Sequence, residues 1–391
     1  MRNPSNRYLF FFCCCFLCLL LQVDVKAQID IKYPTKVSQQ IGDNSRMVIL
    51  GQIDSLLSDI QKGKIRTALI STEDSTLNRS IFMSIRSLLN GKELVSNNID
   101  LINLYKIGPY KYWATIAFTN KSVLNKSRIK LIFSIIIDWN IKDEISFSTP
   151  LRYLTKDWKI KRIKNIHYYY LGNFKRRNAV FFAKKNKQIS ELLGTKRENF
   201  NFYLCYNYQD ILSLLGYTYD ESSFGIIRDG YGVDSHTIFS IMHNEDFSHD
   251  LLHYYSAKIR TKTRNSLADE GFAYLLGNAY YTNSQGEMIN YKDLIKQFKN
   301  FLIKNPDSTI SKLFKSNSHI FPEMASEISG RSLIAAIMCD MVLYKKGKIG
   351  VRKLLNCGSG DDNFFNALND LVNVDENNYT SAVQNYLHDI N

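Results

Sequence analysis

The sequence predicts an α+β protein: an N-terminal part with helices and a curved antiparallel sheet, then a mainly helical part with a small sheet. Residues 110–166 contain runs of Ile, Tyr, Phe and Trp with the two-residue period of strands, bounded by polar turns. From residue 244 onward the apolar residues follow the helical period instead. The chain has 391 residues, 45% of them hydrophobic, and its 24 Tyr and 23 Phe exclude a disordered chain.

The first 27 residues have the pattern of a secretory signal. Arg2 and Arg7 precede an apolar run over residues 8–21, and Ala27 offers a small residue for cleavage. The run is shorter than the roughly 20 residues that cross a bilayer as a helix. We therefore expect cleavage after Ala27 and a secreted or periplasmic protein; the alternatives are membrane anchoring by an uncleaved leader or by a lipidated leader cysteine. No later stretch is long and apolar enough to span a membrane.

Residues 28–172 are expected to form the first domain. After a polar, extended start, amphipathic helices are predicted at 47–60 and 77–89. Strands are predicted at 110–119, 129–140, 144–147 and 158–166. Helices followed by a meander of long strands predict an antiparallel sheet packed against those helices. This order of elements resembles the NTF2-like and cystatin-like folds.

Residues 173–391 are expected to form the second domain, beginning after Gly172. A strand at 179–183, a helix at 188–193, an apolar stretch at 200–206, a helix at 208–215 and a strand at 236–242 come first. Helices are then predicted at 246–258, 266–278, 291–303, 330–345, 349–356, 362–372 and 379–388. A mainly helical domain with a small sheet follows from this pattern.

One pair of histidines has the spacing of a metal site. His249 and His253 are four residues apart, which on a helix places both imidazoles on one face. Glu270, in the first turn of a following predicted helix, offers a third ligand. Two His and one Glu with a fourth position left to water is a ligand set of catalytic zinc. The competing interpretation is a pair of half-buried histidines on an amphipathic helix.

The segment around Glu270 resembles a known family. The residues Ala268-Asp-Glu270-Gly271-Phe-Ala273 are similar to the E-G-x-A helix of gluzincin metallopeptidases, in particular the peptidase MA-like family, in which it follows an H-E-x-x-H helix. The resemblance covers roughly residues 173–391. It implies a zincin-like domain that binds zinc through His249, His253 and Glu270 and acts on a peptide or protein substrate.

The sequence departs from that family at the general base. Asp250 stands where the motif has Glu, so its carboxylate is one methylene shorter. Asp250 could act through a shifted backbone or a second water, Glu245 could replace it, or the domain could have kept its metal and lost its chemistry. Leu267 in place of the usual Trp affects packing only. A proton acceptor displaced by about 1 Å from its productive position can lower the reaction rate roughly 100-fold.

Three functions follow from these residues. The first is an exported zinc-dependent metallopeptidase in which Asp250 is catalytic. The second is a catalytically degenerate zincin-fold protein that serves as a binding or scaffold module. The third is a structural exported protein whose histidine pair is accidental. We favour the first slightly, because all three ligands are present together.

Other reactive residues carry weaker signals. Cys205, Cys339 and Cys357 lack C-x-x-C spacing and are expected to be buried apolar residues. Asp269 could orient a ligand imidazole, but the preferred interpretation is a charge that interacts with the helix dipole. Neither a serine-hydrolase elbow nor a phosphate-binding loop occurs.

The positive charge is concentrated in one segment. The formal net charge is +13, and residues 155–187 hold eleven Lys and Arg against the single acid Asp157. Nucleic acid is not expected as a partner of an exported protein. Contact with an anionic envelope surface or polysaccharide is one interpretation of residues 155–187, and a solvated strand face and linker is the preferred one.

Overall fold

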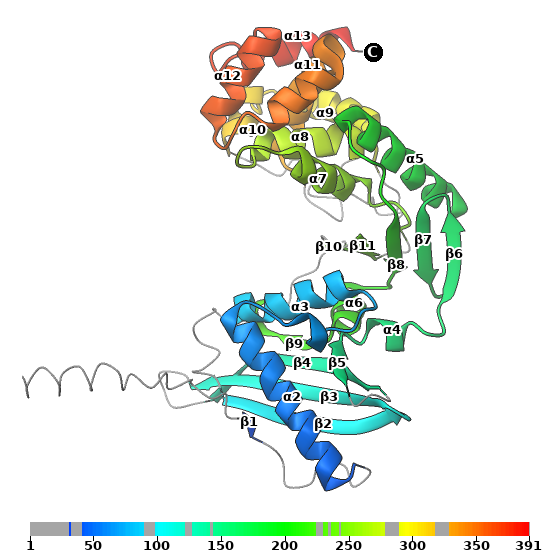
Figure 1. Ribbon diagram of the computed structural model, residues 1–391. Helices are drawn as coiled ribbons and strands as arrows, with labels where there is room; N and C mark the ends of the chain where they lie inside the picture. Colours follow the sequence, from blue (N-terminus) through cyan, green and yellow to red (C-terminus); the bar gives the residue numbers. More distant parts are fainter. Residues whose placement is uncertain are drawn as a thin grey trace, which may run out of the picture. The chain divides into compact units, whose positions relative to one another are not determined.

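The computed structural model of the chain is α+β, as predicted (Figure 1). It describes residues 31–32, 41–89, 98–121, 127–140, 144–223, 230–233, 236–241, 244–277, 289–316 and 328–390. In this described part of the chain, no helix is both long enough and apolar enough to cross a membrane. The predicted leader lies outside the described residues.

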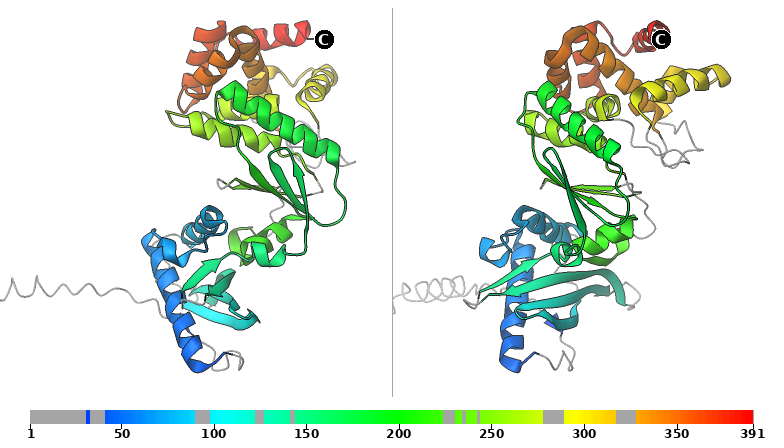
Figure 2. Two further views of the ribbon diagram at one scale, coloured as in Figure 1. Left: turned by 45° about the vertical axis from the view of Figure 1, so that its right-hand side comes forward. Right: turned by 90° about the vertical axis from the view of Figure 1, so that its right-hand side faces the viewer.

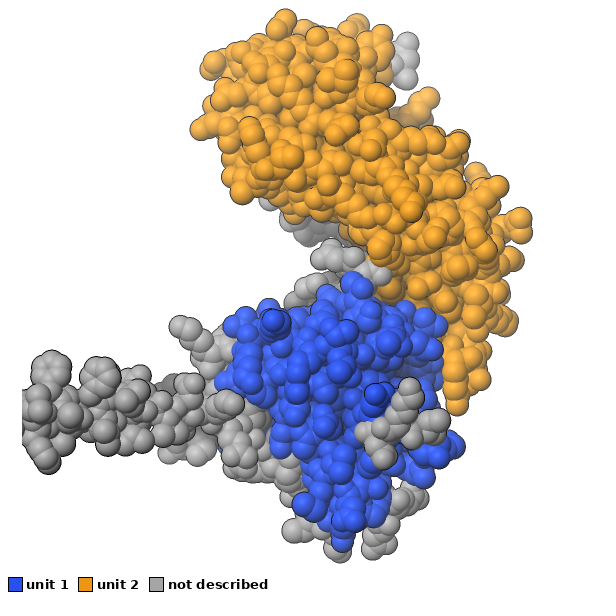
Figure 3. All heavy atoms as spheres, in the orientation of Figure 1, with its two compact units in different colours: residues 1–154, 212–226 blue, residues 155–211, 227–391 orange. Residues whose placement is uncertain are grey.

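The chain divides into two compact units (Figure 3). The first consists of Met1–Leu154 together with Leu212–Ile226, and the second of Thr155–Ile211 and Ile227–Asn391. We expected one boundary near Gly172. The division instead follows Leu154, and a later segment returns to the first unit.

The first unit contains helices and a six-stranded sheet. The helical elements are α2 (Asp43–Lys62), η1 (Thr67–Leu69), α3 (Ser75–Leu88), α4 (Leu151–Leu154) and η2 (Glu221–Ser223). The strands are β1 (Ile31–Lys32), β2 (Asn98–Gly108), β3 (Lys111–Lys121), β4 (Ser127–Trp139), β5 (Ile145–Ser148) and β9 (Tyr217–Asp220). Their order is β1-β2-β3-β4-β5, with β9 also on β4, and all pairs except β1–β2 are antiparallel. The predicted antiparallel sheet is thus confirmed.

The core of the first unit lies between these helices and the sheet. Phe82 of α3 packs edge-on against Phe133 of β4, with ring centroids 6.1 Å apart. Tyr217 of β9 packs edge-on against the same Phe133, with ring centroids 5.2 Å apart. The segment that returns to the first unit therefore contributes a strand and a core side chain.

The second unit has a mixed five-stranded sheet. Its strands are β6 (Lys159–Ile163), β7 (Ile166–Tyr170), β8 (Phe200–Leu204), β10 (Gly230–Val233) and β11 (Thr237–Ser240), in the order β10-β11-β8-β7-β6. Strands β7, β8 and β11 are parallel, and the two outer pairs are antiparallel. Helix α5 (Arg176–Leu193) connects β7 to β8 and lies along the sheet (Figure 2). Helix α6 (Tyr208–Leu215) follows β8 and leads into the first unit.

Two local predictions in the second unit are wrong. The strand predicted at 179–183 lies inside α5, because Ala179, Phe182 and Ala183 are buried at helical spacing while the apolar Val180 and Phe181 are exposed. The single strand predicted at 158–166 is a hairpin of β6 and the start of β7. The chain reverses there at Lys164, which has a positive φ of 55°.

The described residues in the remainder of the second unit are mainly helical, as predicted. It contains α7 (Ser248–Ile259), α8 (Ser266–Gly277), α9 (Tyr291–Lys304), α10 (Ile310–Ser316), α11 (Gly330–Leu355), α12 (Asp361–Val372) and α13 (Tyr379–Asp389). The two helices predicted at 330–345 and 349–356 form α11, which is kinked at Gly347. One hydrophobic core joins α5, the sheet and these helices.

Candidate metal centre

Two neighbouring helices carry the candidate site. Helix α7 follows the short parallel strand β11, and its first backbone N–H, from Ser248, donates to the Asp246 carboxylate. Helix α8 begins after Asn265, whose side-chain oxygen accepts the N–H of Ala268 at 3.1 Å. The amide of Asn265 also donates to the carbonyls of Gly358 and Gly360. Asn265 therefore caps the N-terminus of α8 and ties it to the segment that contains Gly358 and Gly360. Glu270 follows one turn later.

The end of α8 touches the start of α7. The Ser248 hydroxyl donates to the carbonyl of Gly277 at 2.7 Å. A Cβ added at Gly277 would lie only 2.4 Å from the backbone carbonyl oxygen of Ser248 and 2.5 Å from the His249 Cα. Glycine at this position lets the two helices approach closely enough to bring His249 and Glu270 together.

The three predicted ligands converge. The Nε2 atoms of His249 and His253 are 3.2 Å apart. Glu270 places Oε2 at 3.4 Å from His249 Nε2 and Oε1 at 3.5 Å from His253 Nε2. Ligand atoms of a tetrahedral zinc ion, each about 2.0–2.2 Å from the metal, are about 3.3–3.6 Å apart. The measured distances are close to this separation, with a different oxygen of Glu270 facing each histidine, and His249, His253 and Glu270 form a group able to hold a metal ion.

Asp269 orients one of the ligands. Its Oδ2 lies 2.9 Å from Nδ1 of His253, and its Oδ1 accepts the Ser256 hydroxyl at 2.5 Å. A proton on Nδ1 of His253 leaves the lone pair on Nε2, the atom that faces His249 and Glu270. Asp269 lies in the first turn of α8, where a negative charge interacts favourably with the helix dipole, as the preferred interpretation expects. Its side chain is also buried, 2% exposed, and lies against His253, so it fits the orienting role as well.

Two arginines surround these carboxylates. Arg264 donates from Nε to Asp269 at 2.5 Å and from Nη2 to Glu270 Oε1 at 2.7 Å. Arg260 approaches the same oxygen of Asp269 at 3.6 Å. Burial alone would raise the pKa of Asp269, but the hydrogen bond and charge of His253, Ser256 and Arg264 lower it to about 2. The pKa of Glu270 is also lowered, to about 2, because the two histidines and Arg264 outweigh its burial.

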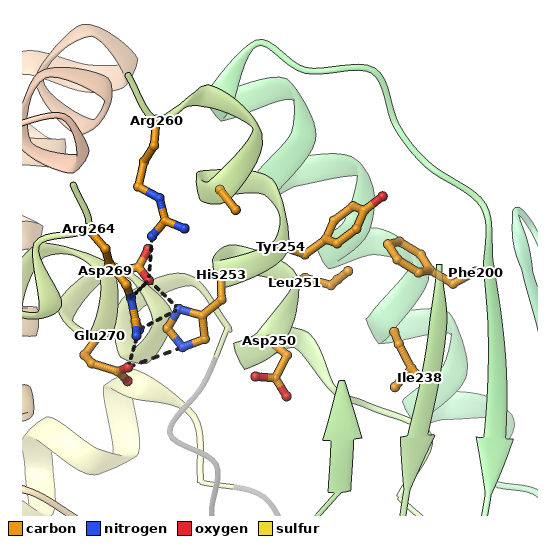
Figure 4. A pocket seen from close by; sticks show the side chains of 11 residues that line it. Phe200, Ile238, Asp250, Leu251, His253, Tyr254, Arg260, Arg264, Asp269 and Glu270 are labelled. Atoms are coloured by element: carbon orange, nitrogen blue, oxygen red, sulfur yellow. Dashed lines mark hydrogen bonds and ion pairs between the residues drawn. The ribbon is translucent and has the colours of Figure 1, made fainter. Parts of the chain in front are cut away.

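The site opens into a cavity of about 420 Å³ (Figure 4). One wall is polar and consists of Asp250, His253, Arg260, Arg264, Asp269 and Glu270. The other wall is mainly apolar and consists of Phe200, Ile238, Leu251, Tyr254 and Ala257. Figure 4 shows Asp250 between the two groups. Burial raises the pKa of the Asp250 carboxyl, and the charges of His249 and His253 partly offset this effect. Asp250 is thus in the cavity, beside the ligands.

Glu245, the alternative acid, faces elsewhere. Its fully buried side chain accepts the backbone N–H of Lys175 at 2.5 Å and lies 3.4 Å from the Asn178 amide. Glu245 therefore stabilises the N-terminus of α5. Tyr255 is likewise structural: its hydroxyl donates to Asn186 at 2.6 Å and accepts the N–H of Glu198.

Among the described residues, no further histidine belongs to the ligand group, although the His236 ring packs against Phe200 and Tyr254, which line the cavity. His236 has a positive φ of 63° and pairs with Glu198 at 3.4 Å, and exposed His388 lies near Asp389. His243 and His319 lie outside the described residues. Tyr274 of α8, which the sequence gave no reason to select, packs edge-on against the His249 ring at 5.6 Å. Burial and the Glu270 charge raise the pKa of Tyr274 to about 12.

No family model, curated protein or solved structure matches the chain. A proposal for its function therefore rests on the geometry of the His249, His253 and Glu270 group.

Proposed function

We propose that this chain is an exported, zinc-dependent metallopeptidase-like protein that hydrolyses peptide bonds. The observation that carries the proposal is the convergence of His249, His253 and Glu270. The two Nε2 atoms are 3.2 Å apart and each lies within 3.5 Å of one oxygen of Glu270, which is close to the separation of ligand atoms around zinc. Two His and one Glu leave a fourth position for water or substrate, which is typical of catalytic zinc. The export proposal rests on the residue pattern of positions 1–27.

The cavity supplies groups suited to hydrolysis. Zinc bound here would polarise a peptide carbonyl and lower the pKa of a coordinated water. Asp250 is the carboxylate placed to accept a proton at its side-chain oxygen, because it lines the same cavity as His253 and Glu270. The apolar wall with Phe200, Ile238 and Leu251 suits an apolar substrate side chain.

Asp269 and Arg264 act on the ligands. Asp269 holds the His253 imidazole through Nδ1, so that Nε2 remains a donor toward the metal position. Arg264 holds both Asp269 and Glu270 through its guanidinium. Because Arg264 contacts Glu270 Oε1, that carboxylate keeps Oε2 turned to His249.

A catalytically degenerate binding or scaffold protein is the second candidate. The shorter side chain of Asp250 favours it, because a general base must lie within hydrogen-bond reach of the proton that it removes. The ion pair of Arg264 with Glu270 favours it too, since it neutralises a ligand without any metal. In this alternative, zinc held by His249, His253 and Glu270 would stabilise a surface that binds a protein partner.

Activity measurements on the zinc-loaded protein separate the two candidates. We expect chelator-sensitive cleavage of a peptide mixture by the wild type and a loss of at least about 100-fold in Asp250→Asn, with zinc content unchanged. Asp370→Asn, which alters an exposed carboxylate elsewhere in the second unit, is the matched control. An inactive wild type whose Asp250→Glu variant gains activity would establish the degenerate protein. Cleavage that persists in Asp250→Asn would exclude Asp250 as the base.

A further inference from the structure

Helix α5 has an outer face with an unusual combination of side chains. Its buried residues are Ala179, Phe182, Ala183, Asn186, Ile189, Ser190 and Leu193. On a helix of 3.6 residues per turn the opposite side, about 140° wide, carries Arg176, Arg177, Val180, Phe181, Lys184, Lys187, Gln188 and Glu191. We call these eight residues the α5 outer face. Val180 is 47% exposed and Phe181 38%, so two large apolar side chains lie among basic ones.

The charges of the α5 outer face are poorly compensated within the protein. Arg176, Arg177 and Lys184 form no ion pair with an acidic residue in the described part of the chain. Lys187 pairs with Glu191, the one acidic residue of α5, at 3.7 Å. Arg176 and Arg177 also occupy the first turn, where the positive end of the helix dipole disfavours cations, and the Glu245 carboxylate that accepts the Lys175 N–H offsets part of this dipole. An external anionic partner would relieve this repulsion.

The basic surface extends beyond the helix. Lys161 of the edge strand β6 places its ammonium 4.9 Å from the ring centroid of Phe174, which lies two residues before the first residue of α5. Leu171, in the same connection, is 39% exposed. Lys185 borders the α5 outer face: its ammonium donates to the carbonyl of Leu276 and lies 5.4 Å from the centroid of the Phe181 ring, so it is not counted among the eight residues.

We propose that the α5 outer face docks on an anionic phospholipid surface, with Val180 and Phe181 at the headgroup boundary and the basic side chains on lipid phosphates. Amphipathic helices with a basic polar border and a few apolar residues bind membranes in this way, without spanning them. Each Lys or Arg near an anionic bilayer strengthens binding about fivefold. An acidic polysaccharide or other soluble polyanion would use the charges but would gain nothing from exposed Val180. The proposal is independent of the metal centre.

Vesicle co-sedimentation of the full chain tests this inference. The probes are vesicles of phosphatidylcholine alone and of phosphatidylcholine with about one-third phosphatidylglycerol. The measured quantity is the ratio of binding to anionic vesicles over binding to phosphatidylcholine vesicles. We expect this ratio to fall at least about tenfold in the double variant Arg177→Glu, Lys184→Glu. The double variant Lys292→Glu, Lys296→Glu on α9 makes the same change of charge at exposed positions and should keep its preference. Comparing variants of the same full chain cancels any contribution of residues 1–27.

A second pair of substitutions separates lipid from other anions. Val180→Ser with Phe181→Ser leaves the charge unchanged and should lower binding to anionic vesicles about five- to tenfold, because the apolar contact is lost. Equal losses in the α5 and α9 charge variants would overturn the proposal in favour of a general effect of net charge. Unchanged binding of the serine variant, with full competition by heparin, would overturn it in favour of a soluble polyanion. Thermal unfolding followed by circular dichroism verifies that each variant is folded.

Discussion

At the scale of single residues, Asp269 connects the groups of the candidate metal centre. Its two oxygens contact His253, Ser256 and Arg264 within 3 Å, and Arg260 lies at 3.6 Å. A buried carboxylate with this many partners holds its neighbours in one arrangement. Asp269 therefore sets the orientation of His253 before any ion arrives.

Replacing Asp269 tests this role. We expect Asp269→Asn to weaken zinc binding about 10- to 100-fold, because the substitution removes the charge that supports the His253 imidazole. Competition titration with a coloured zinc chelator measures the change. Asp370→Asn, in the same unit but exposed, serves as the control and should bind zinc like the wild type. An unaltered zinc affinity in Asp269→Asn would mean that the contact with His253 is only structural.

The same carboxylate predicts a pH dependence of stability in the metal-free protein. The pKa of Asp269 falls from an ordinary 3.8 to about 2 on folding. A depressed pKa stabilises the folded state above pH 3.8, and this contribution is lost as the pH falls through 2. The difference in the free energy of unfolding between the wild type and Asp269→Asn should therefore be larger at pH 5 than at pH 2. We expect this difference to decrease by about 2 kcal/mol between the two pH values. Urea unfolding at both pH values measures it, and a difference that does not vary with pH would refute the assigned pKa.

At the scale of elements, the close contact of α7 and α8 brings the ligands together. His249 and His253 come from α7 and Glu270 from α8. Gly277 allows the contact, since a side chain there would collide with the Ser248 carbonyl and the His249 backbone. Gly271 plays the same part between α8 and α11, with Cys339 Sγ only 2.7 Å from an added Cβ.

Gly277→Ala is therefore expected to disturb both stability and metal binding. Overpacking at this contact should lower the free energy of unfolding by about 1–3 kcal/mol and weaken zinc binding, because His249 must shift. Gly51→Ala in α2 is the matched control, as an added Cβ there meets nothing within 4 Å. That control should stabilise its helix by about 0.5–1 kcal/mol. Gly277→Ala with wild-type stability and zinc affinity would contradict the packing argument.

The sequence predicted most helices because their buried faces repeat with the helical period, and it failed where burial did not follow apolarity. In α5, Val180 and Phe181 are apolar but exposed, so the run 179–183 resembled a strand. Strand β2 was not predicted, because its burial pattern has consecutive exposed residues and its pairing shifts register after Leu101.

The candidate site was predictable in part. Helical spacing placed His249 and His253 on one face, and the E-G-x-A resemblance selected Glu270. The sequence offered the orienting role of Asp269 only as the less favoured interpretation and gave no sign of Arg264, because the contacts of both residues depend on how the connection between α7 and α8 folds back on the site. The position of Glu245 at the start of α5 likewise required the packing of segments distant in sequence.

At the scale of the whole molecule, the chain forms two compact units. The first unit is completed by β9, so its sheet depends on residues that follow β8 of the second unit in sequence. The second unit contains the candidate metal centre and the α5 outer face. Most of the net charge of +13 comes from residues 155–187, a segment of the second unit. At the candidate metal centre, Asp269 and Glu270 are paired with Arg260 and Arg264.

The zinc content of the purified protein tests the central claim most directly. After dialysis against trace zinc, elemental analysis should give about one zinc per chain in the wild type and in His167→Ala, whose histidine lies in β7. His249→Ala should retain little zinc, because it loses one of three ligands. A wild-type content below about 0.2 zinc per chain, unchanged in His249→Ala, would contradict the proposed metal centre.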